Sequence, residues 1–408
     1  MLSQAIPFET TPSDVRRAES KLTAANLPLP HFVSKAPFDP MTISTLTPDQ
    51  ERAAAMSQSQ LMVMKFKRHR LAYYSAILLI VAYVIALFCE LAAPYESQSR
   101  NTDFVRAPQQ SLHLFHEGAF VGPFVYGLSY KLDPETLKRE YTPDTTKVQP
   151  LRFFCSGDTY NFWGLIEGNK HLFCPAQGGT AFLMGTDRLG RDIFSRILYG
   201  GRISLTIGIL GVSVSFILGI IIGGLAGYYG GLFDVVTQRI IEVVQSLPHI
   251  PLWMALASIM PASWSPMLIY VGITVILGLM DWTGLARAVR SKLLSLREED
   301  YVLAAQLMGA KTPRIVGLHL IPGFMSHLIA KATIAIPGMI LGETALSFLG
   351  LGLRPPTTSW GVMLNEAQNI NVVVLYPWLM YPVLPVVLVI LAFNFLGDGL
   401  RDAADPYR

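Results

Sequence analysis

The stretch RISLTIGILGVSVSFILGIIIGGLAGY, residues 202–228, carries a single charge over its whole length. At a rise of about 1.5 Å per residue, a helix of this length crosses the roughly 30 Å of hydrocarbon in a bilayer. Gly219, Gly223 and Gly227 recur four residues apart and share one helical face, where backbones can approach closely. The stretch predicts a membrane span that packs by this face, against either its own chain or a second subunit.

Five further apolar runs predict an all-α polytopic membrane protein with about six spans. They cover residues 71–93, 240–260, 267–285, 328–351 and 378–396. The composition agrees, because 51% of the 408 residues are hydrophobic and only 15% are charged, which is atypical of soluble domains. A net charge of +3 gives no reason to expect nucleic acid as a partner.

Basic residues indicate the orientation of these spans. A cluster precedes the first span, and the segment between the fourth and fifth spans is also basic, whereas residues 261–266 carry no charge. The two basic groups are Lys65, Lys67, Arg68 and Arg70, then Arg287, Arg290, Lys292, Arg297, Lys311 and Arg314. By the positive-inside rule, and with an even number of spans, we expect both termini in the cytoplasm.

The regions between the spans suggest a domain organisation. Residues 95–199 are polar, aromatic and rich in turn formers, and are too long for a simple loop. They predict a small external, periplasmic insert of mixed or β character, with strand-like pieces at 122–132 and 150–155. The predicted parts are a cytoplasmic tail (1–64), the first transmembrane helix (65–94), the insert (95–199) and a core with the other spans (200–408).

Two of the three cysteines, Cys155 and Cys174, fall within the insert. A disulfide between them is plausible in an oxidising external compartment, and two free buried thiols are the alternative. The chain has no C-x-x-C pair, so we predict no metal site.

The segment EEDYVLAAQLMGAKTPRIVGLHLIPG, residues 298–323, is longer than a membrane hairpin needs. We expect a short helix over 301–308 that ends at Gly309, and a second helix that opens at Thr312 and stops before Pro322. Ala304 and Ala305 would leave a shallow surface between charged neighbours. A cytoplasmic partner could dock on that surface.

This segment resembles the EAA loop of binding-protein-dependent ABC importer permeases, through Ala304-Ala305, Gly309 and Leu320-Ile321-Pro322. It departs from the general pattern at Leu303, where the name-giving Glu would stand, and at His319, where Ile is usual. In that family the loop is the coupling helix. The resemblance therefore implies ATPase coupling through Tyr301, Ala304, Ala305, Gly309, Ala310 and Pro322.

Three further motifs are similar to those of the dipeptide/oligopeptide permease family, in its C-type subunit. They are GTDRLGRD (185–192), GETALSFLGLG (342–352) and GDGLRD (397–402). The first predicts a turn at the external membrane face, held by local ion pairs and caps. We interpret this external motif as an interfacial anchor without substrate contact; its key residues are Gly185, Thr186, Asp187, Gly190, Arg191 and Asp192.

The resemblance implies a type I ABC importer permease in the bacterial cytoplasmic, or inner, membrane. Its expected partners are a second permease forming a heterodimer, two ATP-binding subunits, an external substrate-binding protein and the lipid bilayer. The chain has no G-x-x-x-x-G-K-[ST] motif, so ATP and magnesium would be bound by the partner ATPases and this chain would bind no cofactor. The implied solutes are di- and oligopeptides, with nickel, sugars or another small solute as alternatives.

Glu343 lies inside a predicted span, where an ionisable group is costly unless it faces a cavity or a partner. It could line the pathway, form a structural hydrogen bond to a neighbouring helix, or lie nearer the membrane interface. The rival class of ion-coupled transporter should show inverted repeats and several such groups, and neither is evident. A hydrolase is not supported, because His116-Glu117 lacks the second histidine of H-E-x-x-H, with Phe120 in its place. We therefore predict no catalytic residues.

Overall fold

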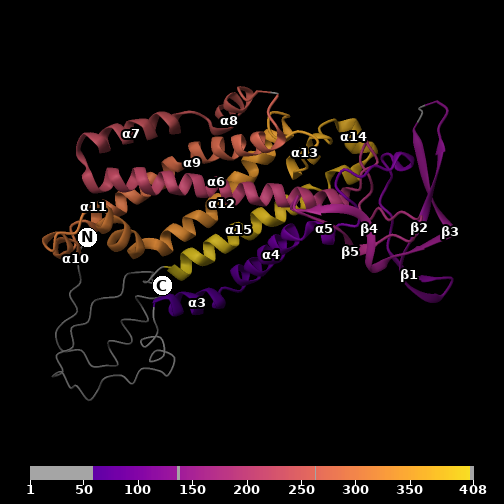
Figure 1. The fold of residues 1–408 in the computed structure, drawn as a ribbon, viewed down its shortest axis with the longest axis horizontal. Coiled ribbons are helices and arrows are strands. Elements are labelled where there is room, and N and C mark those ends of the chain that lie inside the picture. Colours follow the sequence, from indigo (N-terminus) through magenta and orange to yellow (C-terminus); the bar gives the residue numbers. More distant parts are fainter. Residues whose placement is uncertain (1–57, 136–137, 262, 405–408) are drawn as a thin grey trace, which may run out of the picture. The chain divides into compact units, whose positions relative to one another are not determined.

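The computed structural model describes residues 58–135, 138–261 and 263–404. Most of the predicted tail, residues 1–64, lies outside these ranges. The described chain is mainly helical, with strands gathered in one region (Figure 1). The long helices are α4 (Arg70–Leu87), α6 (Ile193–Tyr229), α7 (Gly231–Ser246), α9 (Pro266–Leu296), α12 (Met325–Phe348) and α15 (Val383–Ala404). The shorter α-helices are α3 (Gln58–Arg68), α5 (Cys89–Ala92), α8 (His249–Ser258), α10 (Asp300–Leu307), α11 (Thr312–Arg314), α13 (Trp360–Asn365) and α14 (Ile370–Leu375).

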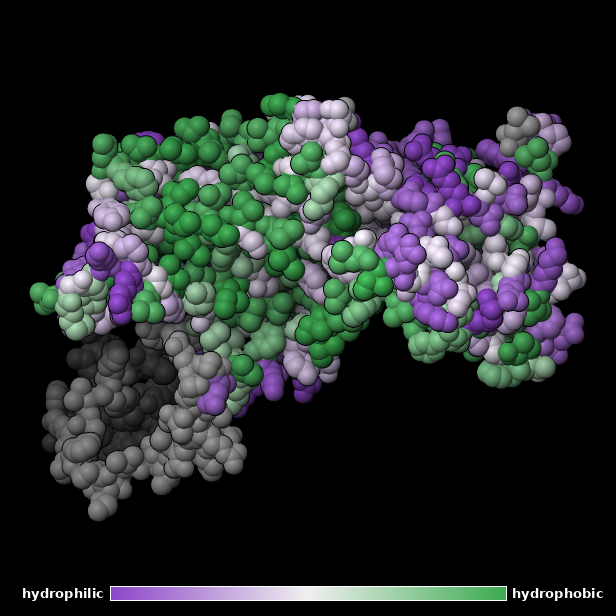
Figure 2. Space-filling view, in the orientation of Figure 1, coloured by the Kyte–Doolittle hydropathy of each residue, from purple (hydrophilic) through white to green (hydrophobic). Residues whose placement is uncertain are grey.

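Five helical stretches of the described chain are long and apolar enough to cross a membrane, and a bent pair makes a possible sixth. The five stretches are Arg70–Leu87, Ile193–Tyr229, Pro266–Leu296, Thr312–Phe348 and Pro377–Ala404. The last of them includes the short 3₁₀ helix η5 (Pro377–Met380). The prediction of about six spans is thus confirmed. Figure 2 shows apolar side chains covering the helices and polar ones covering the strand region.

The predicted span at 240–260 is divided between two helices. The structure has α7 followed by α8, bent by 90° at a break after Ser246. Pro248 stands at the N-cap of α8, and Leu247 before it is extended, with φ −89° and ψ 136°. A proline lacks an N–H and disfavours helix at the preceding residue, which accounts for the break.

The glycine face of α6 packs on α9 within the same chain. A Cβ at Gly227 would lie 2.8 Å from the carbonyl oxygen of Arg290, and one at Gly223 would overlap the backbone of Ala286. At Gly219 it would press on Leu285. At these three positions the glycine face therefore packs against its own chain and not against a second subunit, and the backbones of α6 and α9 approach closely.

The strand region corresponds to the predicted insert. A three-stranded antiparallel sheet contains β1 (His113–His116), β2 (Ala119–Leu132) and β3 (Arg139–Pro150), and a two-stranded ribbon contains β4 (Arg152–Phe162) and β5 (Ile166–Cys174). A disulfide joins Cys155 to Cys174 across the ribbon. The insert ends earlier than predicted, because α6 begins at Ile193. Ser195 and Arg196 lower the hydropathy of the first turn of α6, although both side chains are buried there.

The insert is tied to the first two spans through Glu90 on α5. This carboxylate accepts hydrogen bonds from the Arg202 guanidinium of α6, one of them 2.6 Å long, and from the backbone N–H of Trp163 in the β4–β5 turn at 3.3 Å. Burial raises the pKa of Glu90, but the hydrogen bonds and charge of Arg202 outweigh it, so that the pKa lies below its usual value. The carboxylate is therefore held ionised between the spans and the insert.

Candidate functional site

The predicted coupling segment begins where α9 ends. Arg297 closes α9, and α10 starts at Asp300 and runs to Leu307. Gly309 then takes a left-handed backbone, with φ +81°, and its N–H donates to the carbonyl oxygen of Gln306 at 2.9 Å. A Cβ at this position would meet no atom within 4 Å. Glycine is therefore required by the backbone conformation and not by crowding.

One face of α10 is fastened to the membrane helices. Val302 and Ala305 are 0% and 3% exposed. They pack in an apolar cluster that also contains Val289 and Leu293 of α9, and the residue Phe324 that precedes α12. The prediction that Ala305 belongs to the shallow docking surface is therefore wrong, because at helical spacing it shares the inward face with Val302.

The other face of α10 and the turn after it are exposed and largely apolar. Tyr301, Leu303 and Ala304 lie on this face, and Leu307 and Met308 are 91% and 82% exposed. Sequence reasoning missed Leu307 and Met308; the available signal was two large apolar residues directly before a helix-ending glycine. Large apolar side chains kept this exposed are typical of a surface that a partner covers.

The second helix does not stop before Pro322, contrary to the prediction. The chain continues from α11 through the π-helical η3 (Ile315–Leu320) and the 3₁₀-helical η4 (Ile321–Phe324) directly into α12. Pro322 falls in the first turn of η4. Proline is tolerated there, because a backbone N–H in the first turn makes no hydrogen bond within the helix. Ala310 is half-buried and packs against the same apolar cluster. The coupling segment is thus joined to spans at both ends.

Glu343 is enclosed within the chain. It is 0% exposed, and its carboxylate accepts hydrogen bonds from three serine hydroxyls: Ser204 of α6 at 3.0 Å, Ser347 of α12 at 2.8 Å, and Ser359 before α13 at 2.6 Å. This arrangement matches the structural alternative stated above. In this structure the buried carboxylate ties three helical segments together.

The external motif lies in a buried ionic cluster. Arg191 Nε donates to Asp187 Oδ2 at 2.6 Å, and Arg196 pairs with the same carboxylate oxygen. Both arginines also reach Glu366, after α13, at 3.0 and 3.2 Å. Arg191 and Arg196 are each 2% exposed. The two arginines and two carboxylates balance in charge and pair with one another. A single buried charge at this place would be strongly destabilising.

The remaining residues of the motif shape its turn. Gly185 and Gly190 have φ of +78° and +74°, and a Cβ at Gly190 would overlap the carbonyl of Asn101. Thr186 Oγ1 accepts the backbone N–H of Ala107 at 2.7 Å. Asp192 Oδ2 caps α6 by accepting the N–H of Ser195 at 2.7 Å, and burial raises the pKa of Asp192 to about 7. Among the described residues no cluster of His, Cys, Asp and Glu could hold a metal ion.

Comparison with known proteins places this arrangement in a family. Residues 219–407 match the family model for the inner membrane component of binding-protein-dependent transport systems. Residues 57–109 match the N-terminal transmembrane domain of oligopeptide transport permease C. The dipeptide transport system permease protein DppC of Bacillus subtilis is 41% identical over 224 residues, which cover 54% of this chain and 68% of that protein. The chain belongs to this permease family.

A second relative agrees with this assignment. The oligopeptide transport system permease protein OppC of Haemophilus influenzae is 39% identical over 242 residues, covering 59% of this permease and 75% of the relative. Among solved structures, the inward-facing MetNI methionine ABC transporter has a TM-score of 0.38 and 20% identity, covering 51% of this chain and 97% of that one.

Proposed function

We propose that this permease forms the membrane pathway of an ABC importer together with a second permease, and takes up di- or oligopeptides that an external binding protein delivers. Separate ATPase subunits supply the energy. The peptide assignment is supported by the names of the relatives, which are dipeptide and oligopeptide permeases about 40% identical to this chain. In this proposal the protein lies in the bacterial inner membrane with both termini in the cytoplasm.

The observation that best supports a role of α10 in coupling is that one of its faces is buried against the spans and the other is exposed. Its inner face is fixed to α9 and to the approach to α12 by fully buried side chains, whereas Leu307 and Met308 stand in solvent. A partner that binds the exposed face can therefore displace two spans through one short helix. Apolar contact area of this kind supplies binding energy in protein interfaces.

The enclosed state of Glu343 argues against this residue as the carrier of a coupling ion. An ion-coupled carrier needs ionisable groups that reach a water-filled path, whereas all three hydrogen bonds of Glu343 come from serines of its own chain. Nickel and sugar importers of the same general type are the alternatives that a solute test must separate.

The first experiment is purification of the complex in mild detergent, with mass spectrometry of the attached subunits. We expect ATPase subunits to co-purify with the wild type and to be lost in Leu307→Glu, which places a charge on the exposed face. Leu165→Glu is the matched control, since Leu165 is 85% exposed in the β4–β5 turn and should leave the ATPases attached. Equal retention in all three proteins would argue against α10 as the docking site.

The solute is tested by uptake in proteoliposomes that hold the purified complex and its binding protein. Labelled trialanine should accumulate in an ATP-dependent manner, and unlabelled nickel or maltose should not compete. ATP-dependent uptake of labelled nickel or labelled maltose in a parallel assay, together with no uptake of trialanine, would replace the peptide assignment while leaving the importer assignment intact.

A further inference from the structure

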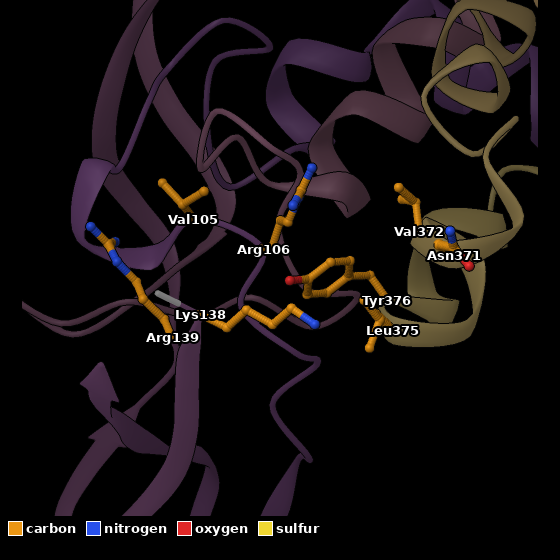
Figure 3. Close-up of a pocket in the computed structure, with 8 residues that line it drawn as sticks. All are labelled: Val105, Arg106, Lys138, Arg139, Asn371, Val372, Leu375 and Tyr376. Carbon is orange, nitrogen blue, oxygen red and sulfur yellow. The ribbon is translucent and has the colours of Figure 1, made fainter. Parts of the chain in front are cut away.

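A basic groove lies at the strand-bearing end of the permease, between the insert and α14 (Figure 3). Its volume is about 410 Å³, and its lining combines three cations, three aliphatic side chains and Tyr376. The cations are Arg106, Lys138 and Arg139, and no acidic residue is among the described residues that line the groove. Like charges brought together without an acid create a site that attracts anions.

Two of the three cations are available to a ligand. Arg139 is engaged elsewhere, because it donates to the carbonyl oxygens of Thr102 and Asp103 at 2.7 Å, and Figure 3 shows it pointing away from Tyr376. Lys138 extends toward Tyr376 in the same view, and has no ion-pair partner within the described ranges. Arg106 lies 4.8 Å from the centre of the Tyr376 ring, and its buried Nε finds no acceptor among the described residues.

The external motif holds both walls of the groove in position. The backbone N–H of Arg106 donates to the carbonyl oxygen of Asp187 at 2.9 Å. On the other wall, the indole N–H of Trp378, two residues after Tyr376, donates to the carbonyl oxygen of Thr186 at 3.1 Å. The motif is therefore more than an interfacial anchor, since adjacent residues of one rigid turn set the spacing between Arg106 and Tyr376.

The backbone of Arg106 is unusual and maintained by these contacts. Its φ is +53°, a left-handed conformation that residues other than glycine seldom adopt. Such conformations persist only where the surrounding structure enforces them, and they concentrate at ligand-binding positions. With this backbone, the guanidinium of Arg106 lies beside the ring of Tyr376 at the groove.

We propose that this groove is a binding site for a carboxylate, presented either by the C-terminus of a peptide or by an acidic side chain of a protein. A guanidinium and an ammonium on two sides of one pocket supply charge-assisted donors for two oxygens. Val105, Val372 and Leu375 add aliphatic walls, which suit an organic acid better than an inorganic anion. The site goes beyond the transport function proposed above, and it is testable by binding alone.

The test uses the full chain in nanodiscs and three short peptides, with binding followed by saturation-transfer NMR. Trialanine carries a terminal carboxylate, acetyl-Ala-Glu-Ala-amide carries only a side-chain carboxylate, and acetyl-Ala-Gln-Ala-amide carries none. We expect the third peptide not to bind, and the stronger of the first two identifies the natural source of the carboxylate. Inorganic phosphate at matched ionic strength should compete poorly.

Variants then locate the binding. Lys138→Gln and Arg106→Asn should each weaken carboxylate binding by about tenfold, as expected for the loss of one charge-assisted hydrogen bond. Asparagine is chosen because it tolerates the left-handed backbone and so preserves the fold. Lys131→Gln, an exposed change on β2 outside the groove, is the matched control and should have no effect.

Three results would overturn the proposal: no binding of either carboxylate peptide to the wild type, equal binding of acetyl-Ala-Gln-Ala-amide, or unchanged binding in both groove variants. Equal competition by phosphate would also overturn it, because the groove would then be a general anion site. Unaltered thermal unfolding of Lys138→Gln confirms that a loss of binding comes from the missing ammonium, since this side chain is exposed.

Discussion

Replacing Gly309 by proline should abolish transport while leaving the permease in the membrane. Proline fixes φ near −65° and has no N–H, whereas this position has φ +81° and donates to Gln306 at 2.9 Å. The substitution therefore removes both the left-handed turn and its hydrogen bond. We expect α10 to lose its fixed exit toward α11, while the long apolar spans still insert.

The magnitude follows from the open space around Gly309, because no atom lies within 4 Å of a Cβ placed there. The effect of a substitution at Gly309 therefore depends on the backbone conformation and not on steric overlap. Alanine should destabilise the turn by about 1–2 kcal/mol, which lowers its population by a factor of about 5–30. Asparagine, which tolerates the left-handed region, should destabilise it less, and proline should destabilise it by about 3 kcal/mol or more.

The assay is ATP-dependent uptake by the reconstituted complex, with the amount of permease in the membrane measured in parallel. Activity should fall in the order Gly309, Asn, Ala, Pro. Gly317→Ala is the control, because Gly317 lies in the same segment, also has open space around it, and has no left-handed backbone. Normal uptake by Gly309→Pro, or an alanine variant as inactive as the proline variant, would refute the reasoning.

Three further predictions concern stability, each measured by thermal unfolding in detergent. Glu343→Leu deprives three serine hydroxyls of their shared acceptor and should destabilise the fold by about 2 kcal/mol or more; Glu343→Gln keeps an acceptor and should be milder, and equal effects would contradict this. The pKa of Asp192 is raised from 3.8 to about 7, so the native state holds its proton more tightly and wild-type stability should fall as pH rises from about 4 to 7. Asp192→Asn, which still caps α6, should then match the wild type at pH 4 and exceed it at pH 8; a difference that does not vary with pH would count against this. Cys174→Ser opens a disulfide across 19 residues and should destabilise the insert by about 3 kcal/mol, and a reductant should reproduce the loss in the wild type but leave the variant unchanged.

The sequence predicted those features that depend on local pattern. Long apolar runs located the spans, because bilayer thickness sets a minimum helix length that few other structures satisfy. Turn chemistry located the end of α10 at Gly309, where a left-handed residue is needed. Strand-like alternation found β2 and the start of β4, whose period of two differs from that of a helix.

The features that were missed depend on contacts between distant residues. Glu366 lies 175 positions from Arg191, and no local signal connects their charges. The burial of Ala305 depends on which face of α10 meets α9, and periodicity over eight residues cannot fix that face. Pro322 predicts a helix end from local sequence, but the structure accommodates it through the change from π to 3₁₀ geometry just before it. In each case tertiary packing overrode the local preference.

The glycine face shared by α6 and α9 has a mechanical consequence. Where side chains separate two helices, changes of side-chain rotamer can absorb a small sliding motion. At Gly223 and Gly227 the backbone of α6 instead contacts the backbone of α9, which has no rotamers to change. Under the coupling role proposed above, a displacement of α9 would move α6 with it, because the backbones of the two helices are in close contact at these positions. Since α6 begins at Ile193, directly after the external motif, such a displacement would extend along α6 to the turn that positions the groove.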